Sequence, residues 1–165
     1  GQPAEPAKPK PTKAQGLEFA ETAARRLEAK HLEKIRAAVV TMPRSGVEFE
    51  RAWKTASADK AATHAFLANL EAAALPRVLK DSLSGPVLHS LLAAVLAQLQ
   101  EEPGAGAHHV ATLEGLAEVP RFNMAVMFLT TKQKAELKAL WAAASAALDS
   151  ALQPRLQAAL SKYKL

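Results

Sequence analysis

Histidine and carboxylate side chains are the residues of this chain best suited to metal binding or acid–base chemistry, and they cluster at only two places. His108 and His109 are adjacent. Adjacent residues on a helix point about 100° apart, and no carboxylate lies three or four residues away, so the pair lacks the spacing of a metal site. We expect a solvated helix start there. Glu101 and Glu102 are also neighbours, and at a helix end we expect both carboxylates to face solvent.

The other residue patterns that support catalysis are incomplete. The stretch Gly104-Ala105-Gly106 precedes an expected helix, but no strand comes before it and no Lys-Ser/Thr pair follows, so it is not a phosphate-binding loop. No serine stands in a Gly-x-Ser-x-Gly turn. The chain has no cysteine, which excludes disulfides, thiolate metal sites and cysteine nucleophiles. We therefore predict a protein that is not an enzyme, with no catalytic residue, cofactor or metal.

The formal net charge of +5 comes mainly from the N-terminal part of the chain. Residues 1–16 and residues 17–45 each carry two more basic than acidic residues, whereas residues 46–165 carry twelve basic and eleven acidic residues. A nucleic-acid-binding domain typically has a basic face on its folded part. We therefore expect no nucleic-acid partner; the alternative is a helical domain that binds nucleic acid through the basic N-terminal arm. No apolar run is long enough to span a bilayer, so we expect no membrane association.

Composition divides the chain into four parts. Residues 1–16, with four prolines and three lysines, read as a disordered Pro/Lys-rich linker. Residues 17–45 read as an amphipathic helix and a loop, because apolar residues recur at helical spacings until Pro43 and Gly46 interrupt them. Residues 46–152 read as a helical interaction domain. Residues 153–165 read as a C-terminal tail that can be helical, and we expect Pro154 to kink or stop the helix before it.

Residues 46–152 show helical periodicity throughout and no sustained alternation of β-branched residues. Asp59 suits an N-cap, and Pro76 suits the first turn of a helix. The clearest pattern has apolar residues at spacings of three and four: Leu88, Leu91, Leu92, Val95, Leu96 and Leu99. We predict an all-α fold, a compact irregular bundle of about six to eight short helices, with an additional N-terminal amphipathic helix.

The most informative stretch is residues 118–129, EVPRFNMAVMFL. On a helix that begins near Pro120, one face carries Phe122, Ala125, Val126 and Leu129, and a second face carries Arg121, Met124 and Phe128. The first face should meet the core. The second face is either also core or an exposed patch for a partner, and the arginine at its edge favours the interface.

Three segments resemble the C-terminal domain family of RNA polymerase II-associated protein 3, which is also found in sperm-associated antigen 1 and in a coiled-coil dynein-assembly factor. They are residues 47–53 (VEFERAW), 75–83 (LPRVLKDSL) and 119–128 (VPRFNMAVMF). The last run is the most specific, although Asn123 stands where the family usually has Asp. The resemblance covers about residues 45–142.

The resemblance implies a helical module of a cochaperone that docks on a RuvB-like AAA+ ATPase, while other regions of the full chain engage heat-shock protein 90. It places docking on the 119–128 segment, so the candidate partner-binding residues are Arg121, Met124 and Phe128. The clients implied are large assemblies such as RNA polymerases. An axonemal dynein arm preassembly factor is the alternative within the family. The implied location is the cytoplasm, with the nucleus and the cilium as alternatives.

Overall fold

The computed structural model describes residues 20–30 and 42–165, and the chain divides into two units, residues 1–34 and residues 35–165. In the first unit, residues 20–30 form a helix with exposed side chains, and Leu27 is 68% exposed. This helix is the middle part of the amphipathic helix expected within residues 17–45. The expected linker, residues 1–16, lies outside the described residues, as do residues 17–19 and 31–41.

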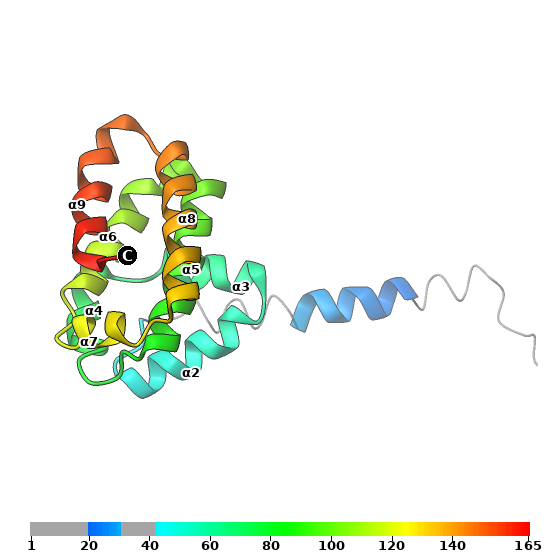
Figure 1. The fold of residues 1–165 in the computed structure, drawn as a ribbon. Coiled ribbons are helices and arrows are strands. Elements are labelled where there is room, and N and C mark those ends of the chain that lie inside the picture. Colours follow the sequence, from blue (N-terminus) through cyan, green and yellow to red (C-terminus); the bar gives the residue numbers. More distant parts are fainter. Residues whose placement is uncertain (1–19, 31–41) are drawn as a thin grey trace, which may run out of the picture. The chain divides into compact units, whose positions relative to one another are not determined.

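The second unit is built from helices alone over the residues that are described (Figure 1). The α-helices are α2 (Gly46–Ser57), α3 (Lys60–Ala68), α4 (Leu75–Val78), α5 (Gly85–Glu101), α6 (Gly106–Ala117), α7 (Phe122–Met127), α8 (Thr131–Ala147) and α9 (Gln153–Tyr163). Three short 3-10 helices connect them: η1 (Ala72–Ala74), η2 (Pro103–Ala105) and η3 (Ser150–Leu152). The predicted all-α bundle is thus confirmed. Among the described helices, none has the length and apolar character needed to cross a membrane.

Side-chain caps begin the helices where the sequence has a small polar residue. The Asp59 carboxylate accepts from the Ala62 backbone N–H at 2.8 Å, which confirms its predicted N-cap role for α3. Ser84 caps α5, which has Pro86 in its first turn. Thr130 opens α8 with a capping box, in which its hydroxyl accepts from the Gln133 N–H and the Gln133 side chain accepts from the Thr130 N–H. These caps fix where the helices start and therefore how they can pack.

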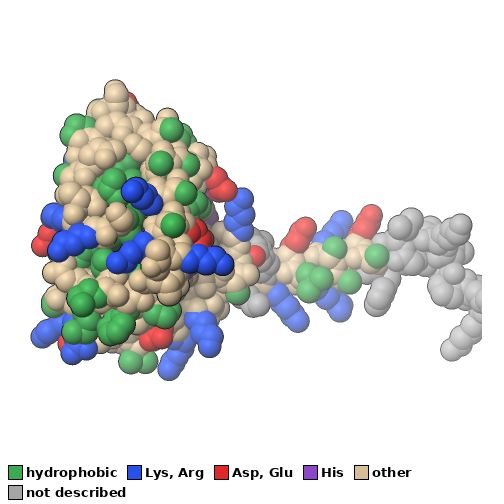
Figure 2. Space-filling model, in the orientation of Figure 1, with side chains coloured by type: hydrophobic (Ala, Val, Ile, Leu, Met, Phe, Trp, Pro, Cys, Tyr) green, Lys and Arg blue, Asp and Glu red, His purple; other side chains and the backbone are tan. Residues whose placement is uncertain are grey.

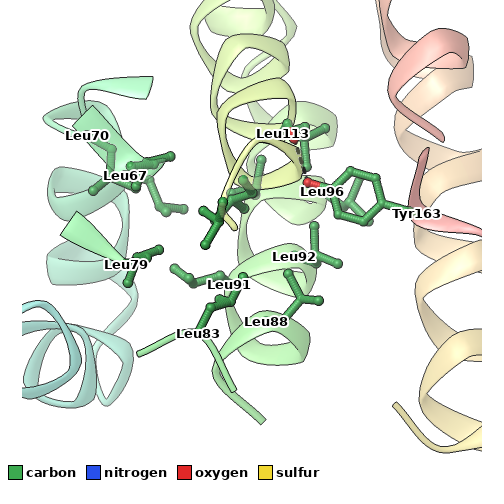
Figure 3. Close-up of a cluster of buried hydrophobic side chains, with 14 of the residues drawn as sticks. Leu67, Leu70, Leu79, Leu83, Leu88, Leu91, Leu92, Leu96, Leu113 and Tyr163 are labelled. Carbon is green, nitrogen blue, oxygen red and sulfur yellow. Dashed lines mark hydrogen bonds between the residues drawn. The ribbon is translucent and has the colours of Figure 1, made fainter. Parts of the chain in front are cut away.

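Helix α5 lies at the centre of the unit, with apolar residues on more than one side (Figure 3). Six of its apolar residues are between 0% and 1% exposed: Leu88, Leu91, Leu92, Val95, Leu96 and Leu99. In Figure 3, Leu91 lies toward Leu79 and Leu83, while Leu92 and Leu96 lie toward Tyr163. Because a helix buried all round needs neighbours all round, α5 determines where the other helices go.

The C-terminal residues differ from the expected tail, because α9 is part of the core. Pro154, expected to kink or stop the preceding helix, instead lies in the first turn of α9, where a missing N–H costs nothing. Leu156, Ala159 and Tyr163, spaced three and four apart, are 0%, 2% and 0% exposed. Only three residues carry this stripe, which is why the sequence pattern alone shows it weakly.

Tyr163 ties α9 to three other helices. Its hydroxyl donates to the Leu113 carbonyl oxygen of α6 at 2.6 Å. Its ring centroid lies 4.7 Å from that of Phe122 on α7 and 5.2 Å from that of Trp141 on α8. Burial raises the pKa of Tyr163 well above 10, so the hydroxyl remains a hydrogen-bond donor.

At the other end, α2 packs on α3 and α5 through aromatic rings. The Trp53 ring centroid lies 5.4 Å from that of Phe66, and its Nε1–H donates to Ser90 Oγ of α5 at 3.1 Å. Phe49 meets Phe66 edge-on at 5.4 Å. Trp53 and Phe49 are 4% and 0% exposed, so both rings are part of the core.

Replacing Trp53 or Leu92 with Ala should reduce the free energy of unfolding by roughly 2–5 kcal/mol, because each change removes a buried side chain and leaves a cavity. Chemical denaturation measures this change. Lys54→Ala, an exposed neighbour of Trp53, is the control and should shift the free energy by less than about 0.5 kcal/mol. Unchanged midpoints for both core variants would show that α2 and α5 do not pack as described.

Tyr163→Phe should cost about 1 kcal/mol, because it removes the hydrogen bond to Leu113 and keeps the ring. Tyr163→Ala should cost roughly 3–5 kcal/mol, because it also removes the contacts with Phe122 and Trp141. Equilibrium unfolding of the two variants separates the hydrogen bond from the ring packing. Equal, small effects of both would mean that α9 is a dispensable tail.

Candidate partner-docking surface

Helix α7 separates its side chains into an inner and an outer set. Phe122, Ala125, Val126 and Leu129, the last just beyond the helix, are between 1% and 5% exposed. On the outside, Met124 is 54% exposed and Phe128, the C-cap residue, is 70% exposed. The predicted division between core and surface is therefore confirmed. The helix starts at Phe122, two residues later than expected, with Pro120 in the turn before it.

Two close contacts hold α7 against the rest of the unit. The Phe122 ring packs edge-on against Tyr163, at an interplanar angle of 87°. At the other end, Gly85 begins α5 directly against Phe128. A Cβ atom at Gly85 would lie 3.0 Å from the Phe128 Cβ and 3.5 Å from the Ala125 carbonyl oxygen, so glycine permits this approach. These contacts hold the inner set in the core, so the backbone of α7 that carries the outer set is held in place as well.

A hollow lies beside the outer set, between α7 and the segment that leads into α5. Its walls come from two stretches of the chain: Asp81, Ser82, Leu83, Ser84, Gly85 and Pro86 on one side, and Arg121, Met124, Ala125 and Phe128 on the other. All three residues predicted to bind a partner therefore line one depression. Figure 2 shows hydrophobic side chains gathered on the surface in this region, at the position of α7 in Figure 1.

Arg121 is only loosely held within the domain. Its Nε lies 3.9 Å from Asp81 Oδ1, and the two side chains are 55% and 71% exposed. An ion pair this long and this exposed contributes little to stability. The guanidinium is therefore available to a carboxylate or a carbonyl group of a partner.

Met127 belongs to the same surface, although the sequence pattern did not single it out. It is 79% exposed, the most exposed of the large hydrophobic residues described. Its position could have indicated this, because residues three apart on a helix are neighbours and Met127 comes three residues after Met124. Large apolar side chains that gather on the surface mark an interaction site more often than isolated ones do.

Glu101 and Glu102 are both exposed, as expected, and each has a basic or histidine neighbour. The Glu101 carboxylate pairs with Lys60 at 2.9 Å, and Glu102 lies 3.5 Å from His64 Nε2. Across the described residues, no three His, Cys, Asp or Glu side chains come close enough to share a metal ion. Gly104 lies within the 3-10 helix η2, and Gly106 follows it as the first residue of α6.

One expectation about the histidines is wrong. His108 lies partly buried, with its Nε2 2.9 Å from the Leu67 carbonyl oxygen, and His109 is buried, at 3% exposure. The expected solvated helix start fails because α6 begins inside the bundle, where η2 and the end of α3 cover its first turn. Among the described residues, none forms a hydrogen bond with His109 Nδ1.

The comparisons with known proteins agree with this architecture. Residues 42–134, more than half of the chain, match the family model described as "Potential Monad-binding region of RPAP3". The chain belongs to this RPAP3 C-terminal family. Its fold is similar to the NMR structure of the C-terminal domain of the human RPAP3 protein, with a TM-score of 0.55 and 18% sequence identity over 74% of this chain and 89% of that one. A search of curated protein sequences gave no significant match.

Membership of the RPAP3 C-terminal family makes this domain a protein-interaction module. The matched residues contain the whole of α7 and the hollow beside it. They end at residue 134, near the start of α8, so most of α8 and all of α9 lie beyond the family match. In this chain, α9 nevertheless supplies the Tyr163 ring that supports α7 from inside.

Acid should destabilise the domain through His109. Burial, followed by the charges of the nearby His108 and His64, lowers the pKa of His109 from 6.5 to about 4. The folded state therefore binds this proton more weakly than the unfolded state. The contribution of neutral His109 to the free energy of unfolding is therefore complete above pH 6.5, and it is lost as the pH falls toward 4. The loss should reach roughly 2–3 kcal/mol.

Chemical denaturation at a series of pH values between 7 and about 4 tests this linkage. His109→Gln is the matched control, because glutamine is polar but does not titrate. Its unfolding free energy should depend less steeply on pH than that of the unchanged protein. If both proteins lose stability in parallel, another group carries the acid sensitivity.

Proposed function

We propose that this domain is the docking module of a cochaperone or assembly factor, and that it binds a RuvB-like AAA+ ATPase through the outer face of α7. One observation carries the proposal: Arg121, Met124 and Phe128 are all exposed around one hollow, while the other side of the same segment is fixed in the core. An arginine, a thioether and an aromatic ring are frequent anchors at protein interfaces.

The wider role follows from the family resemblance and is part of the same proposal. Other regions of the full protein engage the heat-shock protein 90 machinery, and the docked ATPase acts in the assembly of large complexes in the cytoplasm. Assembly of axonemal dynein arms is the alternative client pathway, with the cilium or the nucleus as the alternative location.

The description of the family supports a second candidate partner. It names Monad as a potential ligand of the corresponding region of RPAP3. The same exposed surface is the candidate docking site for that partner, because an arginine beside methionine and aromatic side chains is a common combination at protein interfaces. Binding assays with each purified protein separate the two candidates.

Arg121→Ala, Met124→Ala and Phe128→Ala should each weaken binding of the RuvB-like ATPase, by roughly 1–3 kcal/mol for an anchor residue. The fold should remain intact, because these side chains are exposed. Phe122→Ala should instead lower the melting temperature, since its ring packs on Tyr163. Calorimetric titration and a melting curve for each variant give the comparison.

Asn123→Ala is the matched control, since Asn123 is exposed on α7 but does not line the hollow. Its binding should be close to that of the unchanged domain. Unfolding by Met124→Ala together with normal folding of Phe122→Ala would reverse the assignment of the two faces. Unchanged ATPase binding by all three outer-face variants would place the docking surface elsewhere.

A further inference from the structure

The nearly neutral charge of residues 46–165 conceals two parts of opposite sign. Residues 46–118 carry five basic and nine acidic residues, whereas residues 119–165 carry seven basic and two acidic residues. The net charges are therefore −4 and +5. The basic part begins at α7, so the docking surface lies where the excess of positive charge starts.

Ion pairs within the domain compensate only some of this positive charge. Arg155 pairs with Glu114, and Lys162 pairs with Glu118 at 3.2 Å. The loose contact between Arg121 and Asp81 was described above. These three basic residues therefore have acidic neighbours on the earlier part of the chain.

The first half of α8 is different. The side-chain amines of Lys132, Lys134 and Lys138 form no hydrogen bond or ion pair with any of the described residues. The nearest acid in sequence, Glu136, lies 3.5 Å from His89 Nε2, on α5. Three uncompensated amines therefore stand on one short stretch of helix.

These lysines are close to the apolar surface of α7. Helix α8 begins at Thr131, four residues after α7 ends at Met127. Lys132 and Lys138 are six residues apart, a rise of about 9 Å along the helix. Figure 2 shows Lys and Arg side chains above the apolar surface and at its sides, with fewer Asp and Glu side chains on this face of the domain.

We propose that the segment of the partner that docks here is acidic, with an apolar anchor. The anchor contacts Met124 and Phe128 at the hollow, and neighbouring carboxylates pair with Lys134 and Lys138. This inference rests on the proposed docking function, and it defines the chemistry of the contacting segment. The argument is charge complementarity, because amines without internal partners beside an apolar surface attract carboxylates and disfavour a basic segment.

Phosphate groups would also be attracted to these lysines, but the adjoining surface favours protein. Met124, Met127 and Phe128 present thioethers and a single aromatic ring, and their exposed area gains free energy only by apolar contact. A nucleic-acid backbone offers charge but little apolar surface for them to cover. An acidic protein segment with an apolar anchor can pair with the lysines of α8 and also cover the apolar side chains of α7.

Calorimetric titration of the full chain with the purified RuvB-like ATPase tests the inference. Lys134→Glu/Lys138→Glu should weaken binding about tenfold at about 50 mM KCl, and by less at about 300 mM, because salt screens exposed charges. Lys60→Glu, which reverses an exposed lysine on α3, is the matched control and should leave the affinity within about twofold. Melting curves establish that all variants fold.

The outcomes separate the inference from the function on which it depends. If Met124→Ala weakens binding but the double reversal and added salt have no effect, docking on α7 stands and the acidic partner segment is wrong. If the ATPase does not bind, or Met124→Ala has no effect, the docking proposal fails and this inference fails with it. If a duplex of about 20 base pairs binds more tightly than the ATPase and the double reversal removes that binding, the basic face is a nucleic-acid site, and the inference is overturned.

Discussion

Helix α5 must be enclosed, because its apolar side chains point in more than one direction. Leu88, Leu92 and Leu96 lie along one side and Leu91 lies on another, and all are between 0% and 1% exposed. Each such side chain contributes roughly 1.5–3 kcal/mol when it is buried. This contribution is available only if α3, α6, α7 and α8 all pack around the same helix. The positions of these helices around α5 are therefore set by the need to cover its apolar side chains.

The enclosure also explains why α7 has an exposed face. α7 is only six residues long, and its inner set covers the beginning of α5 and meets Tyr163. Within the described part of the chain, nothing covers the side that carries Met124, Met127 and Phe128. The core therefore creates this exposed surface as well as the stability, because it holds the inner residues and leaves the outer ones exposed.

The support for this surface extends beyond the residues that define the family match. Tyr163 comes near the end of the chain, yet its hydroxyl bonds to Leu113 and its ring backs Phe122. The three lysines in the first half of α8 add positive charge directly after α7 in the chain. A partner would thus meet a surface whose shape depends on α9 and whose charge depends on α8.

Much of this architecture could be predicted from the sequence because it depends on neighbours along the chain. The spacing of the apolar residues from Leu88 to Leu99 predicts a buried helix face. Asp59 is a recognisable N-cap for the helix that begins at residue 60. The helical positions of Phe122 and Met124 put one side chain in the core and the other on the surface. Local geometry is enough for each of these features.

The tertiary structure decided the features that depend on contacts between distant segments. Only packing shows that His109 is buried and that its neighbour His108 meets the Leu67 carbonyl oxygen at the end of α3. Only packing makes α9 part of the core, because Tyr163 at the end of its short apolar stripe contacts Leu113, Phe122 and Trp141. The loose pairing of Arg121 with Asp81 and the unpaired lysines of α8 are likewise decided in three dimensions. Burial and charge compensation depend on which surfaces meet, and spacing along one helix does not contain that information.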